Sequence, residues 1–154
     1  MPAPTMSHVI LTGALLILIF TVQIFYSYVV DNMWAEMVKR ELKELSDSVS
    51  DTLANLYFLA NSTSLGITLR KTLNLPLRVS GSSYRVEIVS SGGSAQSVKA
   101  YLEVKTWIST VSWLPPGLKV NPQIQANQAI QSIGKTALAG CTRFSKNVYV
   151  GLTQ

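Results

Sequence analysis

One stretch of the chain has the spacing of a phosphate-binding loop. Residues 129–136 have the sequence AIQSIGKT; in a true loop of this kind the lysine reaches a nucleotide phosphate and the next residue holds magnesium. The surroundings are wrong for that chemistry. Polar residues precede the stretch where a hydrophobic strand is required, and no aspartate follows Asn61 to complete the magnesium site. We therefore do not predict nucleotide binding.

The chain has too few histidines and cysteines for the common catalytic and metal sites. Its single histidine is His8, at the edge of an apolar stretch, and its single cysteine is Cys141. A Ser-His-Asp or Cys-His arrangement needs a histidine beside the nucleophile, and a zinc site needs several such ligands together. A lone cysteine also excludes a disulfide within the chain. The sequence predicts no metal site and no cofactor.

One pair of carboxylates remains as a candidate for acid–base chemistry. Glu87 and Glu103 are the only acidic residues after Asn61, and paired carboxylates can hydrolyse glycosides. Both stand on the polar faces of predicted neighbouring strands, so ion pairing with basic neighbours explains them without catalysis. We predict that the protein is not an enzyme and has no catalytic residue. The basic neighbours are Arg85, Lys99 and Lys105.

Aromatic and basic residues after Asn61 provide a candidate binding surface. This part of the chain has ten basic residues and two acidic ones, and the part before it has three and six. Tyr101, Trp107 and Trp113 could stack on the bases of a single-stranded nucleic acid in such a basic setting. Tryptophans in a core or an interface are more common. We keep these three residues as candidate contacts and expect that nucleic acid is not the partner.

An apolar stretch organises the rest of the chain. Residues 9–30, VILTGALLILIFTVQIFYSYVV, contain no charge and as a helix would span about 33 Å, enough to cross a hydrocarbon core of about 30 Å. Its threonine and serine hydroxyls can bond to the helix's own carbonyls. No basic residue precedes it and no small-residue cleavage site follows it, unlike a secretory signal. We predict a short tail, residues 1–8, and a single-pass membrane anchor.

The sequence gives conflicting signals about the side of the membrane on which the C-terminal part lies. Three basic residues within fifteen positions after the span favour the cytoplasm. The uncharged tail and the Ser-, Thr- and Gly-rich composition of residues 62–154 favour the outside. The triplet Asn61-Ser62-Thr63 is a glycosylation sequence, which functions only outside the cell. We expect an extracellular location and name Asn61 as a candidate glycosylation site.

The helix is predicted to continue beyond the span as an amphipathic stalk, residues 31–61. Asp31 and Asn32 compete for backbone bonds and are a candidate kink. Beyond them, apolar residues recur every three or four positions, a period near 3.7 that favours straight or slightly right-handed association. This stripe can pack on the chain's own C-terminal part or on other copies, and both alternatives stay open. The stripe consists of Trp34, Val38, Leu42, Leu45, Val49, Leu53 and Leu56, and ends at Ala60.

Residues 62–154, which we call the head, are predicted to form one small β-rich domain. Alternating patterns and turn residues indicate short strands, and residues 90–94, SSGGS, indicate a hairpin loop. The fold class is therefore α+β: a long N-terminal helix followed by a small, antiparallel, sandwich-like head. The predicted elements are strands at 73–79 (an edge strand because of Pro76), 84–89, 98–104 with a continuation to Trp113, 118–120 and 144–152, and a helix from Asn121 to Gly140.

This arrangement resembles that of type IV pilins. Residues 9–30 and the stripe resemble the N-terminal helix of archaeal pilins and of membrane-anchored accessory proteins of the archaellum. The segments SYRVEIVSSGG and VKAYLEVKTWIS, with the LPPG turn at 114–117, look like heads of archaeal pilin-related proteins. The resemblance implies a helix held in the bilayer that packs with copies into a filament core. Because the basic leader and the glutamate near the helix start that pilins carry are missing here, we expect a permanently anchored relative.

Two functions therefore stay open at the level of the sequence. The first is a structural subunit or anchored accessory of an archaeal type IV filament, whose partners are membrane lipid and copies of itself or other pilin-like subunits. The second is a monotopic binding protein whose basic head docks on an envelope layer, a polymer or DNA.

Overall fold

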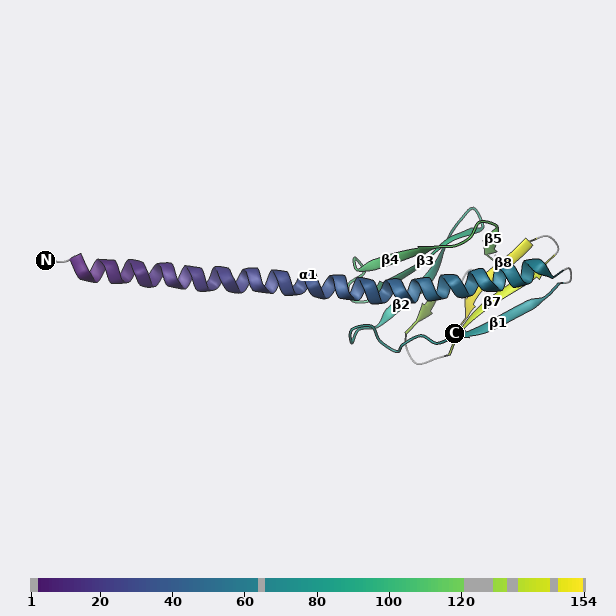
Figure 1. The fold of residues 1–154 in the computed structure, drawn as a ribbon, viewed down its shortest axis with the longest axis horizontal. Coiled ribbons are helices and arrows are strands. Elements are labelled where there is room, and N and C mark those ends of the chain that lie inside the picture. The colour runs from purple at the N-terminus through teal and green to yellow at the C-terminus, as the bar shows by residue number, and fades with distance from the viewer. Residues whose placement is uncertain (1–2, 64–65, 121–128, 133–135, 145–146, 154) are drawn as a thin grey trace. The chain divides into compact units, whose positions relative to one another are not determined.

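The computed structural model consists of one long helix and an eight-stranded sheet (Figure 1). It describes residues 3–63, 66–120, 129–132, 136–144 and 147–153. The helix α1 spans Ala3–Ser62, and every strand follows it in the sequence. The predicted α+β class with a long N-terminal helix is confirmed. The chain forms two compact units, Met1–Met37 and Val38–Gln154, and the boundary between them falls inside α1.

The first unit is helical and exposes its apolar side chains. Val9, Ile17 and Ile24 are exposed by 73%, 69% and 72% of their surface. The helix is long and apolar enough to cross a membrane, and none of its most apolar eighteen-residue window is buried. The structure thus has a candidate membrane span where the sequence predicts one.

The helix is continuous through the span and beyond it. It begins at Ala3, within the predicted tail, and runs through Asp31 and Asn32 without a break in helical structure. The hydroxyls of Thr12 and Thr21 donate to the carbonyls four residues earlier, each at 2.8 Å. These bonds satisfy the two hydroxyls within the helix, which lowers the free energy needed to place them in lipid.

The part of α1 in the second unit packs on the sheet and buries its apolar stripe there. Val38, Leu42, Val49 and Leu53 are fully buried within the single chain, and Leu56 is nearly so. Their burial decides between the two alternatives for these five residues: the stripe packs on the chain's own head. Leu45 is half-buried.

The strands join in one sheet of order β1-β7-β8-β5-β3-β2-β6, with β4 beside β3. All pairs are antiparallel except β5 with β8. The sheet is open and is not clearly a sandwich, because β5 bonds to both β3 and β8 and so joins its two halves. The strands are β1 Thr68–Leu73, β2 Tyr84–Ser91, β3 Ser94–Leu102, β4 Ser109–Trp113, β5 Leu118–Val120, β6 Ala129–Gln131, β7 Ala137–Phe144 and β8 Asn147–Thr153.

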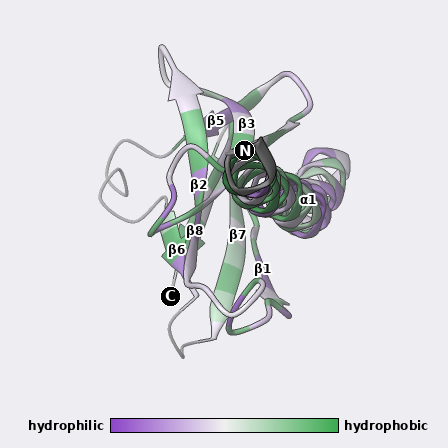
Figure 2. Cartoon of the chain, turned by 90° about the vertical axis from the view of Figure 1, so that its left-hand side faces the viewer, coloured by the Kyte–Doolittle hydropathy of each residue, from purple (hydrophilic) through white to green (hydrophobic). Residues whose placement is uncertain are grey.

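The predicted hairpin of β2 and β3 is confirmed. Alternate residues of β2 are buried, beginning with Tyr84, and those of β3 end at the buried Leu102. Figure 2, coloured by hydropathy, shows apolar segments within the sheet. The connecting residues Gly92 and Gly93 have φ angles of 57° and 81°. Such left-handed angles are accessible to glycine at low cost and match the twist of paired strands.

Two predicted elements of the head are wrong, and the predicted last strand is confirmed as β8 where the structure describes it, except for its first residue, Phe144. The helix expected from Asn121 to Gly140 is replaced by β6 and the start of β7 wherever the structure describes it; residues 121–128 and 133–135 lie outside the described residues. The predicted edge strand 73–79 does not form: the first strand is β1, which ends at Leu73, where the predicted strand begins. Phe144 ends β7 and is 74% exposed instead of facing the core from the last strand.

The wrong helix has a physical explanation. Ala137, Ala139 and Cys141 are buried at every second position, which is the period of a strand. β7 pairs along its length with β1 on one side and β8 on the other. Hydrogen bonds to two neighbouring strands outweigh a weak helical spacing of small apolar residues.

Two side chains of α1 donate hydrogen bonds to backbone carbonyls of β4, which is an edge strand. Lys43 Nζ donates to the carbonyl of Val111 at 3.0 Å, and Ser50 Oγ donates to the carbonyl of Trp113 at 2.8 Å. An unpaired strand edge is a site for unwanted pairing with another chain. The helix therefore both covers the core and closes part of this edge.

Asp47 links the helix to β4 as well. Its Oδ1 accepts hydrogen bonds from Lys43 Nζ at 2.8 Å and from Ser112 Oγ at 2.6 Å. The bond from Lys43, followed by that from Ser112, lowers the pKa of the Asp47 carboxyl. The ion pair is half exposed, so its net contribution to stability is small, about 0–1 kcal/mol.

Two further contacts locate the end of α1 on the head. Arg143 Nη1 donates to the carbonyls of Ala60 at 3.1 Å and Asn61 at 2.8 Å, and also to that of Thr63, which satisfies terminal helix carbonyls. Gly117, in the predicted LPPG turn, has φ of 100°, and a Cβ there would lie 2.7 Å from Tyr57 Oη. Glycine at this turn permits close packing against the helix.

Truncating Leu53 to alanine should lower the free energy of unfolding by about 2–5 kcal/mol, because a fully buried side chain leaves a cavity. Leu59→Ala is the matched control: Leu59 lies on the same helix but is 56% exposed, so its change should stay below about 0.5 kcal/mol. Urea unfolding of the full chain in detergent micelles, followed by circular dichroism, measures both. Equal losses from the two variants would contradict the observed packing of the stripe.

Candidate functional site

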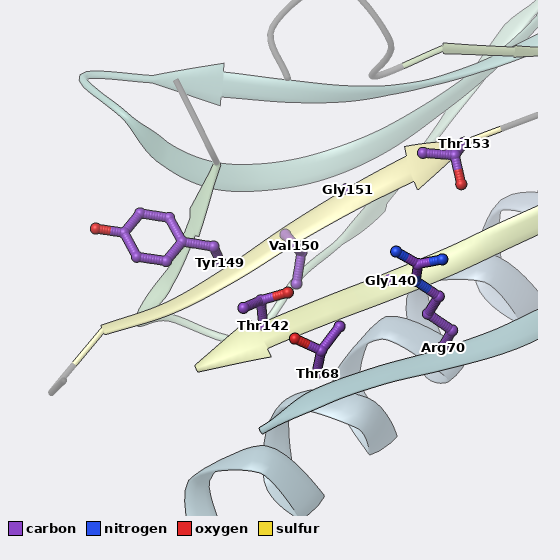
Figure 3. Close-up of a pocket in the computed structure, with 8 residues that line it drawn as sticks. All are labelled: Thr68, Arg70, Gly140, Thr142, Tyr149, Val150, Gly151 and Thr153. Atoms are coloured by element: carbon purple, nitrogen blue, oxygen red, sulfur yellow. The ribbon is translucent and has the colours of Figure 1, made fainter. Parts of the chain in front are cut away.

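A depression of about 300 Å³ lies on β1, β7 and β8 (Figure 3). These three strands are adjacent in the sheet, although residues 74–136 separate β1 from β7 in the sequence. The depression therefore exists only once the distant strands have paired. Its lining residues are Thr68, Arg70, Gly140, Thr142, Tyr149, Val150, Gly151 and Thr153.

The floor of the depression is bare backbone. Gly140 and Gly151 are direct partners in the β7–β8 ladder. A Cβ added at Gly151 would meet nothing within 4 Å, and one at Gly140 would lie 3.8 Å from the Gly151 carbonyl oxygen. Neither glycine has a positive φ, so the backbone itself does not require them. The two glycines leave open a space that ordinary strand residues would fill.

The side chains around this floor are cationic and hydroxyl-bearing. Arg70 pairs with Gly140 in register, and Thr142 pairs with Thr68 on one side and Tyr149 on the other. Figure 3 shows the Arg70 side chain reaching from β1 across β7 at Gly140, whereas the Tyr149 ring lies at the opposite end of the depression. A ligand there would meet a guanidinium at one end and a phenol at the other.

Arg70 has no acidic partner in the part of the chain that the structure describes. The ion pairs Lys43–Asp47 and Arg85–Glu103 do not involve it. An arginine presents five donors in a fixed fork that matches carboxylate and phosphate oxygens. The depression thus offers an uncompensated site for one anionic group.

The three aromatic residues expected as contacts lie elsewhere. Trp113 ends β4 and is 76% exposed, and Trp107 precedes β4 and is 65% exposed, so the alternative that both belong to the core is wrong. Tyr101 in β3 is half-buried; its hydroxyl donates to Glu87 Oε2 at 3.4 Å and Lys99 Nζ lies 5.4 Å from its ring centroid. None of the three lines the depression.

The candidate carboxylates are engaged with their neighbours. Glu103 Oε1 lies 3.5 Å from Arg85 Nη2 and accepts a hydrogen bond from Gln131 Nε2 at 2.9 Å. Glu87 stands opposite Lys99 in the β2–β3 ladder. Cross-strand ion pairing is confirmed for Arg85 and Glu103. Among the described residues no group of three or more metal-binding side chains occurs.

Two other predicted sites can be placed. Ala129–Gln131 of the phosphate-loop pattern form β6, and residues 133–135 lie outside the described residues. Asn61 is exposed near the end of α1, and its glycosylation stays a prediction.

Cys141 is a buried thiol in the middle of β7. It is fully buried, and burial raises the pKa of its thiol to about 11. Burial likewise raises the pKa of Tyr84 to about 12, and its hydroxyl donates to the carbonyl of Pro76 at 2.6 Å. Both groups behave as core residues, since their charged forms are disfavoured.

Comparison with known proteins gives no relative: the chain matches no family model, no curated protein and no solved structure. Function must therefore be argued from the geometry of this chain.

The sequence reasoning missed the depression. Gly140 was assigned to the end of a helix, and Gly151 was passed over within the last strand. The available signal was an isolated glycine inside an alternating strand pattern, which often marks the close approach of another group.

Alkylation of Cys141 by iodoacetamide should be slow at pH 8 in the folded chain and fast in urea, because burial holds the thiol protonated. The folded pKa is raised, so this contribution to stability is complete below pH 9 and is lost as the pH rises through about 11. A thermal unfolding series from pH 8 to pH 11 should show the midpoint fall. Rapid alkylation of the folded chain at pH 8 would contradict the burial.

Proposed function

We propose that the protein is a non-enzymatic, membrane-anchored structural protein: a pilin-like subunit or anchored accessory of an archaeal type IV filament. One observation carries this proposal. A single continuous helix has an uncovered apolar first part and a second part packed on a β-sheet. The first part supports anchoring and assembly, and the sheet supports external contacts.

The uncovered part of the helix needs a partner. Large apolar side chains are exposed along residues 9–30, and such a continuous patch is unstable in water. Lipid covers the patch before assembly, and neighbouring copies cover it in a filament core. Because the helix is uncharged over this length, both environments are compatible with it.

The contact between copies lies on the first part of the helix. The stripe from Val38 to Leu56 is buried under the chain's own head and offers little surface to a second copy. Met33 and Met37, just after the span, are 67% and 51% exposed and extend the uncovered surface. We therefore propose an assembly surface within residues 9–37, in place of the stripe, for which packing on other copies was one of the two alternatives left open by the sequence.

The depression around Arg70 supports a second candidate function. In this alternative the protein is a monotopic anchor whose extracellular head docks on an envelope layer or polymer. Its support is the uncompensated guanidinium over a glycine floor, a feature that anchoring and assembly leave unexplained.

Cysteine scanning tests assembly through the helix. In a Cys141→Ala background, single cysteines at positions 16 to 28 should form disulfide-linked dimers in membranes, with maxima every three or four residues, because packed helices meet along one face. Gel electrophoresis without reductant measures the dimers. Cross-linking that is absent or equal at all positions would contradict assembly and favour the monotopic anchor.

Protease added to intact cells tests the location of the head. If the head is extracellular, the fragment after Asn61 should be lost from intact cells, because the protease does not cross the membrane. A cytoplasmic protein serves as the control for leakage. Cleavage only after membrane disruption would place the head inside and contradict both candidate functions.

A further inference from the structure

The glycine floor has an energetic cost that the fold does not explain. Glycine in a strand interior lowers stability by roughly 0.5–1 kcal/mol relative to alanine. Gly140 and Gly151 stand side by side at paired positions of two central strands, and neither has a close neighbour that would exclude a side chain. Close approach of an external group to the backbone is the remaining use of such positions.

The size of the space favours a small ligand. About 300 Å³ is at the low end of the range for small-molecule pockets. The floor is paired backbone of two glycines, so a sugar ring could lie on it without meeting their side chains. A folded protein partner would instead need a larger surface.

The walls favour a ligand with many hydroxyl groups. Four side chains around the floor carry hydroxyls, and each hydroxyl can both donate and accept a hydrogen bond. The Tyr149 ring adds an aromatic surface at one end. The four hydroxyl-bearing residues are Thr68, Thr142, Thr153 and Tyr149.

Arg70 adds a requirement for negative charge. It is the only charged residue in the lining, and the described part of the chain gives it no acidic partner. One guanidinium suits one carboxylate, which it can bind through two parallel hydrogen bonds. A nucleoside di- or triphosphate would need further cations at the site.

We infer that the depression over Gly140 and Gly151 binds an acidic sugar unit, with its ring on the glycine floor and its carboxylate on Arg70. This inference rests on the second candidate function and deepens it, because it names a carboxylate-bearing polysaccharide or glycan as the ligand of the head. It does not depend on assembly through the helix.

Calorimetric titration of the full chain in detergent micelles tests the inference, with trigalacturonate as the probe. Binding should be at least tenfold tighter than that of neutral maltotriose, since the neutral sugar leaves Arg70 unpaired. A short peptide with one glutamate between glycines supplies the carboxylate without the sugar and should bind at least tenfold more weakly than trigalacturonate. Equal binding of either comparison ligand would overturn the acidic-sugar assignment.

Two substitutions locate the site. Gly151→Val should abolish binding, because the valine side chain would occupy the floor. The unfolding midpoint should stay the same or rise, because valine favours strand structure and its Cβ would meet nothing within 4 Å. Arg70→Gln should weaken binding at least tenfold. Lys71→Gln is the matched control: Lys71 is the next residue of the same strand, on the opposite face, and its change should alter affinity less than twofold.

The results of these experiments can contradict the sugar site without contradicting the docking function on which it rests. If Arg70→Gln and Lys71→Gln weaken trigalacturonate binding equally, the binding reflects unspecific charge attraction. If folded Gly151→Val binds trigalacturonate as tightly as the unaltered chain, the ligand lies elsewhere. Either result overturns the inference. If the full chain sediments with isolated envelope material but does not bind trigalacturonate, the inference fails while the docking function stands.

Discussion

The burial of the helix stripe against the sheet is the interaction on which the rest of the structure depends. Val38, Leu42, Val49 and Leu53 lose all contact with solvent, and each such burial contributes about 1.5–3 kcal/mol relative to exposure. The same packing also removes the inner face of the sheet from water, because its inner residues form the other half of the core. Hydrogen bonds from Lys43 and Ser50 to β4 then fix where along the sheet the helix lies.

This packing gives one helix two different environments. From residue 38 onward the chain covers its own apolar face, but no residue within 9–30 is buried. The uncovered part must be satisfied from outside, and a bilayer and the helices of other copies have the required apolar character. Under the proposed function, anchoring and assembly would use this same surface, either as alternatives or as successive states.

The helix also determines which face of the sheet is available for binding. With one face of β7 and β8 in the core, the opposite face presents Gly140 and Gly151 to solvent. The paired backbone beneath them holds Arg70 in register beside the floor. A site on paired strands is better organised than one on a loop, since hydrogen bonds on both sides restrain each position.

The sequence by itself determined the features that depend on neighbours in the chain. The uncharged run 9–30, the spacing from Val38 to Leu56 and the Gly92-Gly93 turn specified the candidate membrane span, the amphipathic helix and the β2–β3 hairpin, because helices and tight turns are formed by local contacts. Only the tertiary structure decided that the stripe packs on the head, that residues 137–144 form a strand, and that Arg70, Gly140 and Gly151 meet. Those outcomes depend on pairing between segments distant in the sequence, whose register is chosen by the hydrogen bonding and burial of the whole sheet and has no local signature.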